Sequence, residues 1–220
     1  MQKNKLIYVF LVLIPIAFIA AYFFRHRENK PLRMLPYYGP KNYSASRDTV
    51  YHTVPDFQFT DQKGEKISQE NVKGKIYVAD YFFTSCQSIC PVMSDQLERF
   101  ASEFRNNPSV LILSHTVNPE EDSVPTLKEY ADRHHASPDQ WHFLTGDKKK
   151  LYELARKGYL LDAEEGSGGS DDFIHTQNFA LIDKERHIRG FYDGTDSTDV
   201  NRLITDTKIL LDEYAWKEKH

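Results

Sequence analysis

The stretch that decides the fold is KIYVADYFFTSCQSICPVMSDQL, residues 75–97. Residues 75–84 form a nearly unbroken apolar run, which is typical of a strand buried on both faces of a sheet. From Pro91 onward, apolar residues recur at helical spacing. The segment therefore predicts a central strand followed directly by a helix, with Cys86 and Cys90 at the junction between them.

These two cysteines are the only ones in the chain, and three residues separate them. Within one helical turn, residues four apart lie on the same face with β-carbons about 5–6 Å apart. Two thiolates placed there can bind one ion or close into a disulfide. Because a helix N-terminus stabilises negative charge, we expect at least one thiol to have a lowered pKa. The simpler alternatives are two small buried side chains or a permanent disulfide.

A metal site would need further ligands, and nine histidines compete for the place. Thiolates favour Cu(I) or Zn²⁺; zinc usually takes four ligands, whereas two sulfurs and one imidazole suit Cu(I). His175 follows the Gly/Ser-rich segment 164–172, expected to be a mobile loop that could carry it to the cysteines. His115 ends a predicted strand at the same edge of the sheet and remains a competitor. His134 and His135 fall at a predicted helix end, where solvation or the helix dipole accounts for them.

Outward from the cysteines, predicted strands and helices alternate along the chain. The strands are 75–84, 110–115, 141–144, 179–183 and 187–192; the helices are 91–104, 124–134, one beginning after Asp147, and 199–215; a short hairpin covers 57–64. A parallel first half followed by an antiparallel second half predicts an α/β fold, a mixed-sheet sandwich of the thioredoxin-like kind.

The N-terminal segment 6–24 contains 19 residues and no charge. As a helix it would span about 28 Å, the thickness of a bilayer core. It predicts a retained transmembrane helix; a cleaved signal peptide is the alternative, although its apolar run is usually shorter. We expect a membrane anchor at 1–27, a Pro-containing connector at 28–54 and one domain at 55–216. Four basic residues closely follow the span. Because basic residues favour the cytoplasmic side of a membrane span, they would place the domain inside the cell and not outside it.

The composition narrows the possible functions. The chain has 220 residues, of which 40% are hydrophobic and 27% charged, and this is a globular composition. Residues 1–33 hold six of the 28 basic groups and one of the 32 acidic ones, so the rest of the chain has a net charge of −9. A domain this acidic repels phosphate backbones, which argues against nucleic-acid binding.

Four blocks of the chain resemble the Sco/SenC family, in the family's order, over residues 55–214. The blocks are DYFFTSCQSICPVMSDQL (80–97), SHTVNPEEDSVPTLKEYADRH (114–134), WHFLTGD (141–147) and IHTQNFALIDKERHIRGFYDG (174–194). The resemblance implies a thioredoxin-like domain that binds copper, as Cu(I) or Cu(II). It also implies that Cys86, Cys90 and His175 are the copper ligands.

The family takes part in assembling the dinuclear copper centre of cytochrome c oxidase. The resemblance therefore implies a membrane-tethered chaperone that delivers copper to the subunit II site, reduces that site's cysteines, or does both. It also implies a single-pass protein of the bacterial inner membrane with its domain on the periplasmic or outer side. We give this implication more weight than the basic residues that follow the span. Asn118 stands where many members have Asp in a Val-Asp-Pro turn, and Ile174 stands where many have Asp directly before the ligand histidine. Asp171 and Asp172 lie slightly upstream, so the sequence does not identify the acidic group that would orient the imidazole.

Other functions of a thioredoxin-like dithiol stay open. One is a thiol-disulfide oxidoreductase. Such proteins resemble one another in a Cys-x-x-Cys motif with a proline opposite it, whereas this chain has Cys-x-x-x-Cys and no proline after Pro138. A peroxidase would need its family's Pro-x-x-x-Thr-x-x-Cys motif, whereas Thr84 lies only two residues before Cys86. A membrane-bound redox or copper sensor is a third. The sequence leaves the copper donor and any enzymatic activity undetermined.

Overall fold

The structure is a computed structural model that describes residues 13–16, 18–19, 33–43, 49–161, 174 and 176–219. The chain divides into two compact units, Met1–Arg33 and Met34–His220. In the first unit, residues 13–16 and 18–19 are helical. No helix within these described ranges has both the length and the apolar character that a membrane span requires.

A five-stranded mixed sheet organises the second unit, in the order β7-β6-β5-β8-β9. Its strands are β5 (Ile76–Phe82), β6 (Val110–Thr116), β7 (Trp141–Leu144), β8 (Asn178–Ile182) and β9 (Ile188–Asp193). Strands β5, β6 and β7 are parallel, whereas β8 is antiparallel to β5 and β9 is antiparallel to β8. The predicted thioredoxin-like α/β fold with a mixed sheet is confirmed.

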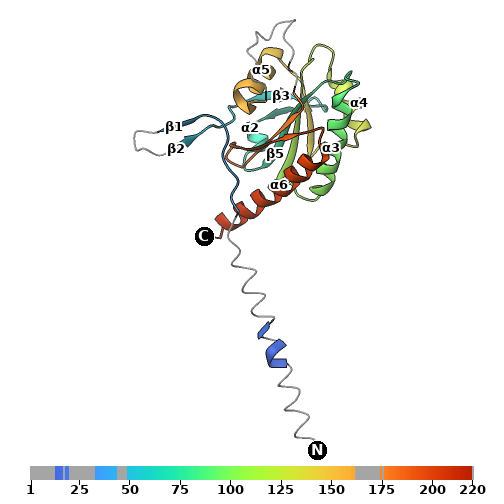
Figure 1. Cartoon of the computed structure of the whole chain (residues 1–220). Helices are drawn as coiled ribbons and strands as arrows, with labels where there is room; N and C mark the ends of the chain where they lie inside the picture. The colour runs from blue at the N-terminus through green and yellow to red at the C-terminus, as the bar shows by residue number, and fades with distance from the viewer. Residues whose placement is uncertain are drawn as a thin grey trace, which may run out of the picture. The chain divides into compact units, whose positions relative to one another are not determined.

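Helices cover both faces of this sheet (Figure 1). On one face lie α3 (Ile89–Glu103), α4 (Val124–Arg133) and α6 (Ser197–Lys217); on the other lie α5 (Lys148–Glu153) and the π-helix η1 (Leu154–Tyr159). Successive residues of a strand point to opposite faces. In β5, Ile76 and Val78 pack in the core on the α3 face, whereas Tyr77 and Ala79 pack on the α5 face. Burial on both faces explains why the sequence of β5 is a nearly unbroken apolar run.

Shorter elements surround the sheet. They are β1 (Lys41–Tyr43) paired with β2 (Thr49–Tyr51), β3 (Gln58–Thr60) paired with β4 (Lys66–Ser68), and α2 (Gln69–Val72). The β3–β4 hairpin and the N-cap of α5 were predicted; the Asp147 carboxylate accepts the Lys150 N–H at 2.9 Å. We did not predict β1, β2 or α2, because three or four residues are too few to show a hydrophobic period.

The end of the connector packs on the domain. Leu35 is buried in the core on the α3 face. The Arg189 guanidinium donates to the carbonyls of Leu35 and Pro36, at 2.7 and 3.1 Å. The Tyr38 N–H donates to the Ile188 carbonyl at 2.9 Å. These contacts come from residues far along the chain, so no local pattern in the connector could indicate them.

Candidate metal centre

Both cysteines lie at the carboxyl end of β5, where the chain crosses into α3. Cys90 is the second residue of α3 and is 4% exposed, whereas Cys86 is half-buried in the loop before the helix. The expectation that one helical turn carries both sulfurs is wrong, because α3 begins only at Ile89. The two side chains nevertheless meet, since a hydrogen bond joins the two thiols. Both thiols are free.

The two thiols have opposite pKa shifts. Burial acts to raise the pKa of Cys86, but hydrogen bonds from the Cys90 thiol, the Cys90 and Ser88 backbone amides and the Ser88 hydroxyl outweigh it and lower the pKa to about 7. Burial, followed by the hydrogen bond to Cys86, raises the pKa of Cys90 to about 12. The prediction of one thiol with a lowered pKa is confirmed. Near neutral pH, Cys86 is therefore substantially thiolate, while Cys90 holds its proton.

A buried carboxylate fixes the loop that leads to Cys86. Asp122, which is 1% exposed, accepts the hydroxyl protons of Thr84 and Thr116. It also accepts the Thr84 N–H, at 3.3 Å from Oδ1. Asp122 lies in the connection between β6 and α4, so this connection holds the loop two residues before Cys86. Asp122 was not predicted, because nothing local in the sequence distinguishes it from the acids at 120 and 121.

A second buried acid lies on β5 beneath the thiol site. Asp80 is 2% exposed and accepts the hydroxyl proton of Ser114, whose oxygen in turn accepts the Trp141 indole N–H at 2.8 Å. Burial raises the pKa of Asp80 to about 7, although the Ser114 hydrogen bond acts to lower it. Its charge also contributes to the raised pKa of Cys90. An acid within an apolar strand was the signal that could have drawn attention to this residue.

The structure separates His115 from the cysteines. Its fully buried ring stacks on Tyr81 at 5.0 Å between centroids and lies 5.3 Å from Tyr159, in the core on the α5 face. Burial lowers its pKa to about 4, so the ring is neutral at physiological pH. Cys90 belongs to the opposite, α3 face. His175 and the segment 164–172 lie outside the described residues.

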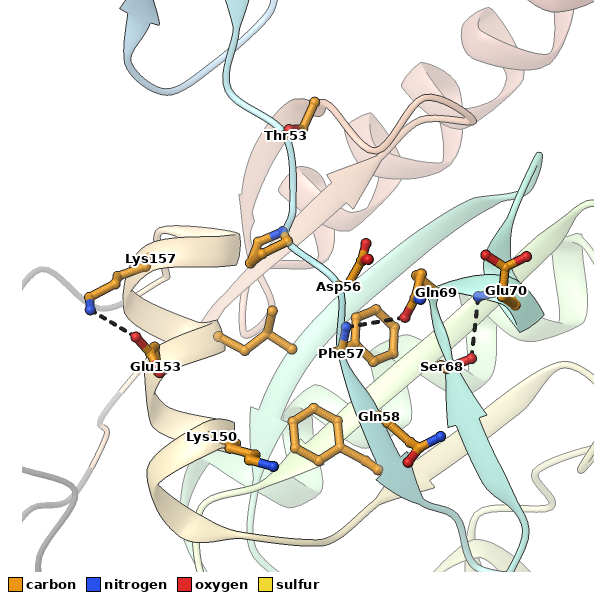
Figure 2. A pocket seen from close by; sticks show the side chains of 13 residues that line it. Thr53, Asp56, Phe57, Gln58, Ser68, Gln69, Glu70, Lys150, Glu153 and Lys157 are labelled. Carbon is orange, nitrogen blue, oxygen red and sulfur yellow. Dashed lines mark hydrogen bonds and ion pairs between the residues drawn. The ribbon is translucent and has the colours of Figure 1, made fainter.

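A cavity of about 990 Å³ opens elsewhere, beside α5 and α2 (Figure 2). Phe57 and Phe59 line it, and the Glu153–Lys157 ion pair, at 2.8 Å, stands at its side. Neither cysteine is among its lining residues. The cavity is thus separate from the thiol site.

A mixed-sheet sandwich with a dithiol at the start of the helix after its central strand defines a thioredoxin-like dithiol protein. The family model described as SCO1/SenC matches residues 45–211. The SCO1 protein homolog of Bacillus subtilis (strain 168) is 32% identical over 164 residues, which cover 74% of this chain and 84% of the relative. The chain therefore belongs to the SCO1/SenC family.

Solved structures agree with this assignment. BsSco, described as a member of the Sco family of cytochrome c oxidase assembly proteins in which a disulfide switch was identified, matches with a TM-score of 0.62 and 30% identity, over 72% of this chain and 93% of its own. Bradyrhizobium japonicum ScoI, solved with copper bound, matches with a TM-score of 0.57 and 21% identity, over 72% and 99%. At that identity, the second likeness concerns the fold alone.

Proposed function

We propose that this protein is a membrane-tethered copper chaperone that assists assembly of the dinuclear copper centre of cytochrome c oxidase. The observation that carries the proposal is the reduced cysteine pair at the start of α3, with the pKa of Cys86 lowered to about 7. The membership of the SCO1/SenC family and the likeness to BsSco, a member of a family of cytochrome c oxidase assembly proteins, support it. Copper is the cargo in this proposal.

The proposed ligands are the thiolates of Cys86 and Cys90 and the imidazole of His175. Thiolates are soft ligands that select Cu(I). Two thiolates around one monovalent ion leave the site with a single negative charge. Because burial keeps Cys90 protonated in the free protein, binding must release its proton, so copper affinity should rise with pH.

Delivery would proceed by ligand exchange. Three ligands leave one side of Cu(I) open, where a thiolate of the oxidase subunit II site can attack the ion. Cys86 is half-buried and Cys90 almost fully buried, so Cys86 is the ligand that an incoming thiolate reaches first. We expect the Cys86–copper bond to break early and the Cys90–copper bond to break last.

The same dithiol supports a second function, reduction of the cysteines at the oxidase copper site. The Cys86 thiolate would attack a disulfide sulfur of the partner, breaking its S–S bond and forming a mixed disulfide. Cys90 would then lose its proton and displace the partner's sulfur as a thiolate. Two electrons pass to the partner, and Cys86 and Cys90 become a disulfide that no longer binds copper. The lowered pKa of Cys86 favours this chemistry.

The proposed tether is the uncharged segment 6–24. In this proposal, an anchor at 1–27 and a connector at 28–54 hold the domain, 55–216, on the periplasmic or outer side of the bacterial inner membrane. Nineteen consecutive residues without a charge are long enough to cross a bilayer as a helix. Tethering would keep the thiol site near a membrane-embedded oxidase.

Copper titration tests the ligand set. The reduced full chain, kept in detergent, is expected to bind one Cu(I) per molecule. The Cys86→Ser, Cys90→Ser and His175→Ala variants should each lower the affinity by more than about 100-fold, because groups that merely orient metal ligands already contribute 10–100-fold. Competition with a chromophoric Cu(I) chelator measures the affinity, and X-ray absorption identifies sulfur and nitrogen ligands.

His135→Ala, which alters an exposed histidine, is the matched control and should bind Cu(I) as the wild type does. The oxidised protein should not bind it. Wild-type affinity for both Cu(I) and Cu(II) in His175→Ala would show that the histidine assignment is wrong. Tight Cu(I) binding by both serine variants would overturn the chaperone proposal itself.

A further inference from the structure

A second group of metal-binding side chains lies on the outer surface of α3 and α4. Asp95 and Glu98 belong to α3, and His134 is the C-cap residue of α4. Each offers one ligand atom, and these atoms all lie within 4.8 Å of one another. The proposed copper chaperone function uses none of the three residues.

The elements that carry these residues are held firmly together. Asp95 and Glu98 are three residues apart on one helix, so they share a face. His134 Nδ1 lies 2.8 Å from Glu98 Oε1. Beneath them the hydroxyls of Ser94 and Tyr130 are 2.9 Å apart and join α3 to α4. A site on two packed helices keeps its geometry better than a site on loops.

A cavity of about 520 Å³ adjoins the group. Glu98 and His134 line it together with His135, Arg105 and Gln140. Gln140 is 9% exposed, and its amide nitrogen has no hydrogen-bond partner among the described residues. This buried donor is suited to bond a water or a carboxylate oxygen on an ion in the cavity. The Arg105 guanidinium opposes a cation there, so two carboxylates are needed to outweigh it.

We propose that Asp95, Glu98 and His134 form a second metal site, which binds a divalent first-row ion, Cu²⁺ more tightly than Zn²⁺. Imidazole and carboxylate suit both ions, and affinity follows that order. Two ligands at about 2.1 Å from one ion lie about 3.4 Å apart at a tetrahedral angle, so ligand atoms that lie within 4.8 Å of one another must close by at most about 1.4 Å to share an ion. The two carboxylates neutralise the ion's charge.

The proposed site differs in chemistry from the cysteine pair. Two sulfurs select monovalent copper, whereas nitrogen and oxygen ligands select the divalent ion. The helix α3 carries one cysteine of the pair, Cys90, and carries Asp95 five residues further on. The chain would therefore hold copper of different oxidation states at two separate places. The second site does not depend on the first.

Titration of the full chain in detergent with Cu²⁺ or Zn²⁺ tests the proposal. A background of Cys86→Ser, Cys90→Ser and His175→Ala removes the proposed chaperone ligands. One equivalent of either ion should still bind, and His134→Ala or Glu98→Gln should lower the affinity at least tenfold. Asp132→Asn is a matched control from the same helix end and should leave the affinity unchanged.

Tryptophan fluorescence gives an independent signal. The ring of Trp141 lies 6.4 Å from that of His134, so Cu²⁺ at the site should quench it. Trp216→Phe leaves Trp141 as the only tryptophan. Equal affinity and quenching with and without His134 and Glu98 would overturn the proposal, as would loss of binding in Asp132→Asn alone. If His134→Ala changes the urea unfolding midpoint of the ion-free protein, its loss of binding could reflect lower stability. The affinity of Glu98→Gln then tests the proposal.

Discussion

At the scale of single residues, the two cysteines differ because their surroundings differ. Cys86 lies in a loop and receives hydrogen bonds that stabilise its thiolate, whereas Cys90 is buried in the first turn of α3. The thiol that meets an incoming partner is thus the one that is already ionised. The buried thiol keeps its proton until it binds a metal ion or attacks a mixed disulfide.

Alkylation with iodoacetamide should reveal this difference. Because the thiolate is the reactive form, the rate at Cys86 should rise with pH through a midpoint near 7, the pKa to which its hydrogen bonds lower it. Cys90 should stay unreactive in the same range, because its pKa is raised to about 12. Mass spectrometry of the labelled peptides measures each site separately.

A matched pair of serine variants tests whether the Ser88 hydroxyl contributes to the lowered pKa of Cys86. Ser88→Ala removes the hydroxyl that lies 3.6 Å from the Cys86 sulfur, so the Cys86 midpoint should move upward. Ser85→Ala, at an exposed position in the same loop, should leave it in place. A common midpoint for both cysteines would contradict the assignment of opposite shifts.

At the scale of elements, one buried arginine joins segments that are distant in the chain. Arg189 on β9 pairs with Asp183 in the β8–β9 turn and with Glu213 on α6, at 2.9 Å each, and all three side chains are fully buried. Its guanidinium also binds the carbonyls of Leu35 and Pro36. The last helix and the end of the connector are therefore both attached to the hairpin through this residue.

Replacing this arginine should weaken the fold. Arg189→Ala leaves the buried Asp183 carboxylate without its counter-charge and leaves Glu213 with Lys217 alone, and removal of one partner of a buried pair costs about 3–5 kcal/mol. Urea unfolding measures the loss. Lys128→Ala breaks the exposed pair with Asp132 and should cost less than about 1 kcal/mol. Equal unfolding midpoints for the two variants would show that the arginine is not the junction described.

At the scale of the whole molecule, the proposed function needs both the anchor and the thiol site. In cells lacking the gene, the full chain should be recovered with membranes and should restore cytochrome c oxidase activity. A chain without residues 1–27 should appear in the soluble fraction and restore little activity, because it is no longer held near the oxidase. Cell fractionation and an oxidase assay measure the two effects.

The full-length Cys86→Ser variant is the control, since it keeps the proposed anchor and loses the thiolate. It should reach the membrane without restoring the oxidase, and added copper should restore activity if delivery is the task. Full oxidase activity from this variant would contradict the chaperone function.

The sequence by itself determined the order of the five sheet strands and the longer helices, the mixed sheet, and the strand-to-helix junction at which the cysteine pair lies. These features depend on local periodicity, which a strand buried on both faces or an amphipathic helix must show. The run at 75–84 predicted β5, and helical spacing after Pro91 predicted most of α3. The four motif blocks led to the SCO1/SenC family, to which the chain belongs.

Only the tertiary structure decided what depends on contacts between distant segments. The side-chain pairing of Asp122 with Thr84 spans 38 positions, and that of His134 with Glu98 spans 36. The pKa values of the thiols, the burial of His115 on the opposite face and the docking of Leu35 likewise depend on burial and on neighbours from other elements. Burial and hydrogen bonding are set by the packed fold, and no local pattern of residues encodes them.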